Sequence, residues 1–130
     1  MRPITTDSQQ LTDILNVLKY MQSVAASFFL LGVVFDTTVT YSMFKALGAA
    51  TFYSHEANKD FASFLVTGNL NFGVLVQFFL LIVVAVLPIV FSYLYLKSKN
   101  SLLLKAFAAS IIIQLFIGAA KMFGGLTWIM

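Results

Sequence analysis

Residues 71–96 read NFGVLVQFFLLIVVAVLPIVFSYLYL, an apolar run without a charged side chain. A helix needs roughly 20 apolar residues to cross a bilayer, so this stretch predicts a transmembrane helix, which Pro88 should kink. A Thr-Gly-Asn break at residues 67–69 separates it from the apolar residues before it. Two further runs, residues 20–46 and residues 102–129, fit one span each. The sequence therefore predicts an all-α integral membrane protein with three transmembrane helices.

The composition supports a single membrane domain over residues 1–130. Hydrophobic residues make up 60% of the chain and charged residues 10%, whereas a soluble domain is about 25% charged because its surface faces water. We therefore expect the lipid bilayer to be its main partner. The basic residues are scattered between apolar runs and form no nucleic-acid footprint. The absence of Cys excludes disulfides and thiolate metal sites, and the single His55 excludes a pair of imidazole ligands, so no metal or cofactor is predicted.

The segments outside the three runs predict two shorter helices. Residues 5–19 carry an apolar stripe with the i, i+3, i+4, i+7 spacing of an amphipathic helix, formed by Leu11, Ile14, Leu15 and Leu18. This segment either lies on the membrane surface as a separate helix or extends the first span as a helix. Residues 58–67 predict a short helix in the loop between spans one and two. That helix is either interfacial or re-entrant, and re-entry would require protein to cover its backbone.

The distribution of Lys and Arg predicts the orientation. With three spans, five basic residues fall on one side of the membrane and two, Lys45 and Lys59, on the other. Cytoplasmic loops carry the excess of positive charge, so we expect a multi-pass protein of the cell membrane with a cytoplasmic N-terminus and an external C-terminus. The apolar run after Lys19 is about as long as a membrane is thick, unlike the short core of a signal peptide. The first helix is therefore expected to be retained.

Away from the ends of the predicted spans, where Lys45 and Lys105 lie, two residues are charged: Asp36 and Lys121. A charge at membrane depth is costly, so such side chains usually face the bundle interior and find a partner. Asp36 lies roughly 6 Å outward of the middle of the first span at 1.5 Å per residue, and Lys121 roughly 5 Å outward of the middle of the third. Because opposite charges sit at nearly the same depth, we predict an Asp36–Lys121 ion pair.

Polar and small residues form a stripe on one face of each predicted span. Thr40 belongs to the stripe of the first span, Gln77 to the second and Gln114 to the third. Small residues let helices approach, and polar residues hydrogen-bond between them, so these stripes predict a shared polar seam; the alternative is a chance arrangement of common residues. Polar residues of the outer loop are predicted either to form the rim of a pocket over the seam or to be an ordinary solvated loop: His55, Glu56 and Asn58.

The order of several of these residues resembles a family of small prokaryotic membrane proteins known only as a domain of unknown function. The resemblance rests on Asp36-x-x-x-Thr40 in the first span and Glu56-x-Asn58 in the loop. It implies that these four residues belong together, and it implies no known reaction. The chain departs from the pattern where Lys59 replaces a proline, and where Gln77 stands for a lysine of the second span.

Local geometry gives the loop residues structural roles as well. Asn58 is placed to cap the helix over residues 58–67. Glu56 is placed to accept a hydrogen bond from backbone amides near that cap or from Lys121. We weight this capping role above a catalytic one. Adjacent residues of a helix do not face each other, which counts against His55 and Glu56 acting together as acid and base.

Three functions compete. The first is a structural or accessory subunit of a homo- or hetero-oligomeric membrane assembly, held by the polar seam. The second is a small proton, cation or solute transporter or channel subunit that uses Asp36. The third is an enzyme acting on a membrane-embedded substrate, but the sequence contains no nucleophile motif, no second intramembrane aspartate and no metal-ligand spacing. We therefore expect the subunit role first, transport second and no enzymatic activity.

Overall fold

The computed structural model describes residues 2–130, with side chains described from residue 8 onward. It is 91% helix and has no strand in the described chain. Five helices follow one another: α1 (Arg2–Leu47), α2 (Ala49–His55), α3 (Lys59–Thr67), α4 (Phe72–Ser98) and α5 (Ser101–Ile129). Three of them, α1, α4 and α5, are long and apolar enough to cross a membrane. The fold class predicted from the sequence is therefore confirmed to this extent.

Helix α1 differs from the prediction of a separate surface helix over residues 5–19. It continues without interruption from Arg2 to Leu47, as in the alternative of a helical extension. No Gly or Pro occurs between residues 4 and 31 to break it. Leu15 and Leu18 of the amphipathic stripe pack against the core of the bundle. Leu11 and Ile14 of the same stripe remain about half exposed, so only its second half joins the bundle.

The connection between α1 and α4 contains two short helices, of which the sequence predicted only the second. Gly48 has φ of 83°, a conformation that glycine adopts readily, and the chain turns there from α1 into α2. Phe52 of α2 is fully buried, stacked on Trp128 at 5.5 Å between ring centroids. Helix α3 covers nearly the predicted residues 58–67. One buried aromatic residue on a helix this short leaves too little periodicity to predict α2.

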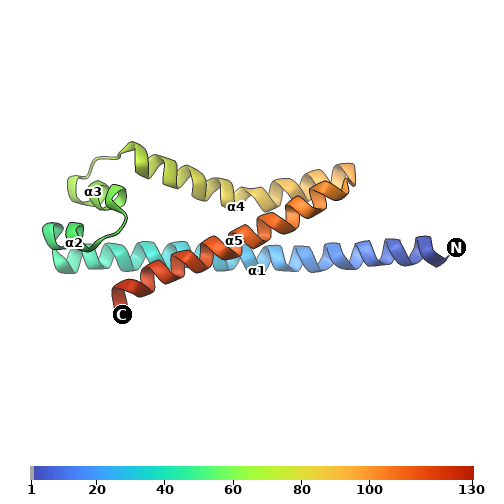
Figure 1. Cartoon of the computed structure of the whole chain (residues 1–130), viewed down its shortest axis with the longest axis horizontal. Helices are drawn as coiled ribbons and strands as arrows, with labels where there is room; N and C mark the ends of the chain where they lie inside the picture. The colour runs from blue at the N-terminus through green and yellow to red at the C-terminus, as the bar shows by residue number, and fades with distance from the viewer. Residues whose placement is uncertain (1) are drawn as a thin grey trace.

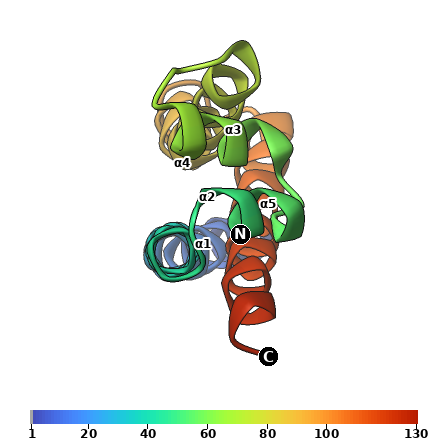
Figure 2. The same cartoon turned by 90° about the vertical axis from the view of Figure 1, so that its left-hand side faces the viewer.

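The three long helices are not evenly packed. Helix α5 packs along α1 and along α4, whereas α1 and α4 touch each other little. Figure 1 shows α5 lying beside α4 at one end of the molecule and crossing α1 toward the other, where α1 and α4 are far apart. Figure 2, seen from that open end, shows α2 and α3 lying across it. The bundle thus has a closed end, near the α4–α5 turn, and an open end, near α2 and α3.

Glycines allow the crossing of α1 and α5. A Cβ atom at Gly32 would lie 2.5 Å from the carbonyl oxygen of Gly118, and one at Gly118 would lie 3.0 Å from the Cα atom of Phe29. The distance at Gly32 admits no Cβ atom unless the backbone shifts, and the distance at Gly118 is tighter than most Cβ contacts, so the two backbones pack closely here. Small residues commonly allow such close approach of apolar helices.

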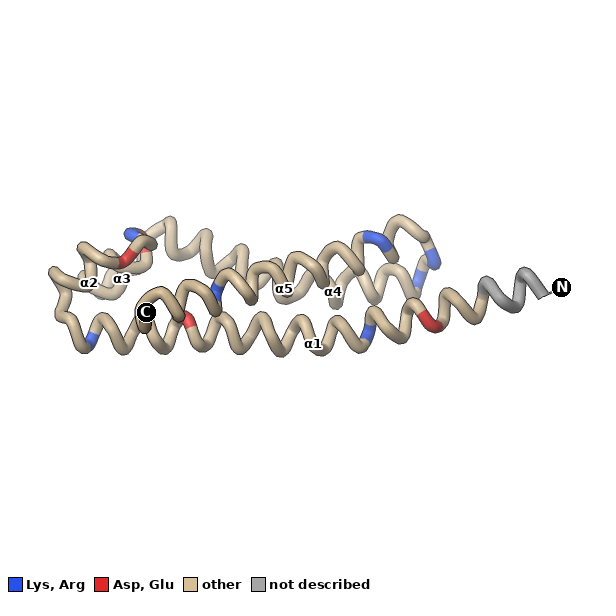
Figure 3. Tube along the Cα trace, turned by 60° about the horizontal axis from the view of Figure 1, so that its bottom comes forward, with Lys and Arg blue, Asp and Glu red and all other residues tan. Residues whose placement is uncertain are grey.

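Charged residues gather at the two ends of the bundle (Figure 3). Between the ends, one acidic residue of α1 and one basic residue of α5 lie next to each other, and these are Asp36 and Lys121. The outward faces of the three long helices are apolar and exposed, for example at Leu31, Phe79 and Phe116. This distribution is compatible with a multi-pass membrane protein.

Candidate functional site: a polar cluster at the open end

Asp36 of α1 and Lys121 of α5 face each other, as their depths predicted. The Lys121 Nζ atom lies 3.7 Å from Asp36 Oδ2, and the hydroxyl of Thr40 donates to Asp36 Oδ1 at 3.4 Å. Gly124 leaves room for the carboxylate, because a Cβ atom there would lie 3.1 Å from Asp36 Oδ1. The side chains of Lys121 and Asp36 remain 31% and 24% exposed. The ion pair therefore borders open space instead of being enclosed between helices.

A second polar group joins the short helices to α4. The side-chain amides of Asn58 and Gln77 bond reciprocally: Asn58 Nδ2 donates to Gln77 Oε1 at 2.8 Å, and Gln77 Nε2 donates to Asn58 Oδ1 at 3.1 Å. Asn58 Oδ1 also accepts from the backbone N–H of Phe61 at 3.2 Å, which caps α3 as predicted. Glu56 Oε1 accepts from the backbone N–H of Asn58 at 3.0 Å. Glu56 thus takes the first of the two roles expected for it and makes no ion pair with Lys121.

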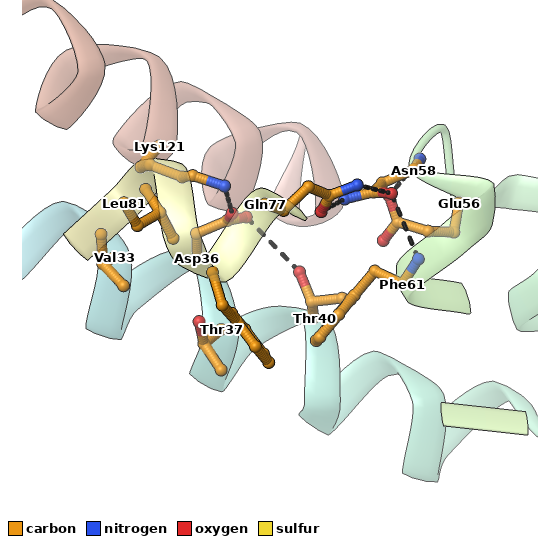
Figure 4. A pocket seen from close by; sticks show the side chains of 11 residues that line it. Val33, Asp36, Thr37, Thr40, Glu56, Asn58, Phe61, Gln77, Leu81 and Lys121 are labelled. Atoms are coloured by element: carbon orange, nitrogen blue, oxygen red, sulfur yellow. Dashed lines mark hydrogen bonds and ion pairs between the residues drawn. The ribbon is translucent and has the colours of Figure 1, made fainter. Parts of the chain in front are cut away.

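Two cavities meet at this cluster. The smaller, of about 70 Å³, lies among α1, α3, α4 and α5, and Figure 4 shows the polar side chains that line it pointing toward one another. The larger, of about 530 Å³, lies between α5 and the connection from α2 to α3. A water molecule occupies about 30 Å³ in the liquid, so the smaller cavity has the size for a few waters and the larger for an organic molecule. Four residues line both: Asp36, Glu56, Asn58 and Lys121.

Gln114 lies outside this cluster, although the sequence grouped it with Asp36. Its Nε2 atom donates to the carbonyl oxygens of Val84 and Ala85, at 3.2 and 3.1 Å. Pro88 has no N–H for the carbonyl four residues before it, which is that of Val84. Gln114 therefore replaces the hydrogen bond that Pro88 removes from α4. Its own Oε1 atom is buried and has no partner among the described residues.

The loop residues lie at the mouth of the larger cavity. His55 lines it together with Glu56, and the His55 Nδ1 atom lies 2.9 Å from the carbonyl oxygen of Thr51. Trp128 also lines this cavity, held against Phe52. The sequence gave no signal that Trp128 would reach a cavity. Its position depends on α2, which the sequence did not predict.

No family model, curated protein or solved structure matches the chain. The resemblance to the family of unknown function therefore stays a prediction. The four residues on which it rests, two from α1 and two from the α2–α3 connection, all line the smaller cavity. Lys121 of α5 and Gln77 of α4 also line that cavity (Figure 4).

Among the described side chains, no group of three His, Cys, Asp or Glu residues is arranged to hold a metal ion. The cluster instead offers one ion pair, one amide pair and one further carboxylate around open space. Such a site can accommodate charged side chains between the apolar helices and can bind polar groups.

Proposed function

We propose that the protein is a multi-pass membrane protein that serves as a structural or accessory subunit of an oligomeric membrane assembly. The observation that supports this proposal is the partial exposure of the Asp36–Lys121 pair within the apolar part of the bundle. Exposure of a charged group to acyl chains costs about 3 kcal/mol on insertion scales. A second copy of this chain or another membrane protein, completing the open end, removes that exposure.

The contacts favour this role over transport through Asp36. Asp36 is held by Lys121 and by the hydroxyl of Thr40. A proton or metal cation that used this carboxylate would compete with a covalently attached ammonium group at the same depth. Three spanning helices are also few to enclose a pathway. The ion pair is therefore assigned to holding α1 and α5 in the arrangement that presents the open end to a partner.

The size of the purified full chain tests the proposal. Wild-type protein in mild detergent and in nanodiscs is expected to have a native mass above that of a monomer. Asp36→Asn and Lys121→Met should each reduce this species, because each leaves one charge unpaired. The double variant should restore part of it.

Asp13→Asn combined with Lys19→Met is the matched control, since it removes one charge of each sign from α1 away from the cluster and should leave the mass unchanged. A wild-type protein that is monomeric in both environments at every concentration would contradict the subunit role.

The proposed orientation places the N-terminus in the cytoplasm and the C-terminus outside. Because the chain contains no Cys, single cysteines report on each side without background. Ser54→Cys in α2 is expected to react with a membrane-impermeant maleimide on intact cells, and Ser101→Cys at the start of α5 only after lysis. The opposite pattern would reverse the topology, and equal labelling of both would refute insertion as three spans.

A further inference from the structure

The larger cavity has the size and lining of a small-molecule site. Its volume of about 530 Å³ falls within the range of about 300–1,000 Å³ that such sites occupy. Ile117 and Ala120 contribute an apolar wall from α5, and Trp128 adds an aromatic one. Glu56 and His55 stand where the α2–α3 connection closes over it. A mixed lining of this kind suits an organic ligand with one charged group.

The charges in this cavity do not balance. It is lined by two carboxylates, Asp36 and Glu56, and by one cation, Lys121. Lys121 pairs with Asp36, and this is the one ion pair among the described side chains. Glu56 accepts a single neutral hydrogen bond, from the backbone of Asn58 through Oε1. The excess negative charge therefore resides on Glu56, whose Oε2 atom has no partner in the described chain.

The surroundings of Glu56 favour an organic cation over a metal ion. A divalent ion needs several oxygen or nitrogen ligands at about 2.0–2.6 Å, and among the described residues no three His, Cys, Asp or Glu side chains are grouped to supply them. An ammonium group needs one carboxylate and benefits from an aromatic ring within about 6 Å. Trp128 supplies the ring, and Phe52 fixes it by stacking at an interplanar angle of 9°. The cavity also leaves room for the carbon atoms attached to the ammonium group.

We propose that the larger cavity binds a molecule bearing a small ammonium group, with the Glu56 carboxylate as its counter-ion and Trp128 as its aromatic wall. Two sources share this chemistry, a water-soluble amine and the ethanolamine headgroup of a lipid. The cavity is formed within one chain, so the proposal does not depend on the assembly role.

The single Trp of the chain is Trp128, so its fluorescence reports directly on the cavity. The full chain in mild detergent is titrated with ethylammonium chloride, and sodium chloride serves as the salt control. We expect a saturable change with ethylammonium that sodium does not produce. In a second arm, nanodiscs of phosphatidylethanolamine are compared with nanodiscs of phosphatidylglycerol. A response in the lipid arm alone would assign the headgroup as the source, and a response in detergent a soluble amine.

Glu56→Gln is expected to weaken binding at least tenfold, whereas Asp13→Asn, an exposed carboxylate whose partner is Gln9, should leave the affinity unchanged. A shift of the thermal unfolding temperature with ethylammonium, lost in Glu56→Gln, is the second measurement, and circular dichroism shows that the variant is folded. Should Glu56→Gln not fold, Glu56→Asp keeps the charge and should retain binding with reduced affinity. Equal responses to ethylammonium and sodium together with equal responses in the two lipids, or full affinity in a folded Glu56→Gln variant, would overturn the proposal.

Discussion

At the closed end of the bundle the helices pack apolar side chain against apolar side chain, whereas at the open end polar side chains and two short helices fill the space between them. The closed end is built around Ala25, Phe107 and Ile111, which are almost fully buried. The open end contains Asp36, Lys121 and the cavities beside them. The same three helices therefore make an apolar contact and a polar one within a single molecule.

The difference between the two ends follows from how α5 lies. It follows α4 closely at the α4–α5 turn and then diverges toward α1 (Figure 1). Where three helices converge, large apolar side chains can interdigitate. Where α1 and α4 separate, α2 and α3 connect them, because α2 packs against α1 and α3 against α4. The Gly32–Gly118 contact between α1 and α5 sets this divergence, because two backbones in contact leave little freedom to slide.

Breaking that crossing should give the largest effect. Gly32→Leu places a side chain where the Gly118 carbonyl oxygen already stands, so α1 and α5 must separate. We expect a loss of about 3 kcal/mol in the free energy of unfolding, the upper range for overpacked positions, together with loss of the cavities at the open end. Reversible unfolding in mixed detergent micelles measures the free energy.

Ser27→Leu is the control, since it places the same side chain on the exposed face of α1 and should change stability by less than about 0.5 kcal/mol. If Gly32→Leu were as stable as this control, the glycine contact would not set the helix crossing.

The extent to which the sequence predicted this structure reflects the range of each interaction. The three long helices are predicted from the length of the apolar runs, which is a local property. The pairing of Asp36 with Lys121 is predicted from depth, because the rise per residue of a helix gives the depth of each residue along a span. The sequence predicts less well which neighbour each helix face contacts. Gln114 shares a face of α5 with Gly118, but it donates a hydrogen bond to the Val84 carbonyl that Pro88 leaves free in α4. Neither α2 nor the place of Trp128 was predicted, since Phe52 and Trp128 meet only after the chain has folded.

The closed end offers the next effect, at Gln114. Gln114→Leu keeps the volume but removes the donor to the Val84 carbonyl, which Pro88 leaves without its helical partner. A buried group left without a partner costs about 1–3 kcal/mol, and we expect about 2 kcal/mol here. In a Pro88→Ala background the backbone N–H returns, so the same change at Gln114 should cost clearly less. Equal costs in the two backgrounds, measured as a double-mutant cycle of unfolding, would show that Gln114 does not compensate for the proline.

The smallest effect compares one helix cap at each end. Asn58 caps α3 at the open end and also bonds reciprocally to Gln77, whereas Asn100 caps α5 at the closed end through its contact with the Leu102 N–H. Replacing either cap by Ala should cost about 1 kcal/mol. Asn58→Ala should cost about 0.6 kcal/mol more, a typical value for an interhelical hydrogen bond between apolar helices.

The Gln77→Leu variant separates the two terms. In this background Asn58→Ala removes only the cap of α3, because the hydrogen bonds to Gln77 are already absent. Its cost in the free energy of unfolding should then fall to that of Asn100→Ala. If the two asparagines cost the same already in the wild-type chain, the amide pair adds nothing to the open end. The polar cluster there would then be held by the Asp36–Lys121 pair and by the packing of Phe52. The other described side-chain hydrogen bond between α3 and α4, from Asn71 Nδ2 to the Asp60 carbonyl oxygen, involves only the N-cap of α4.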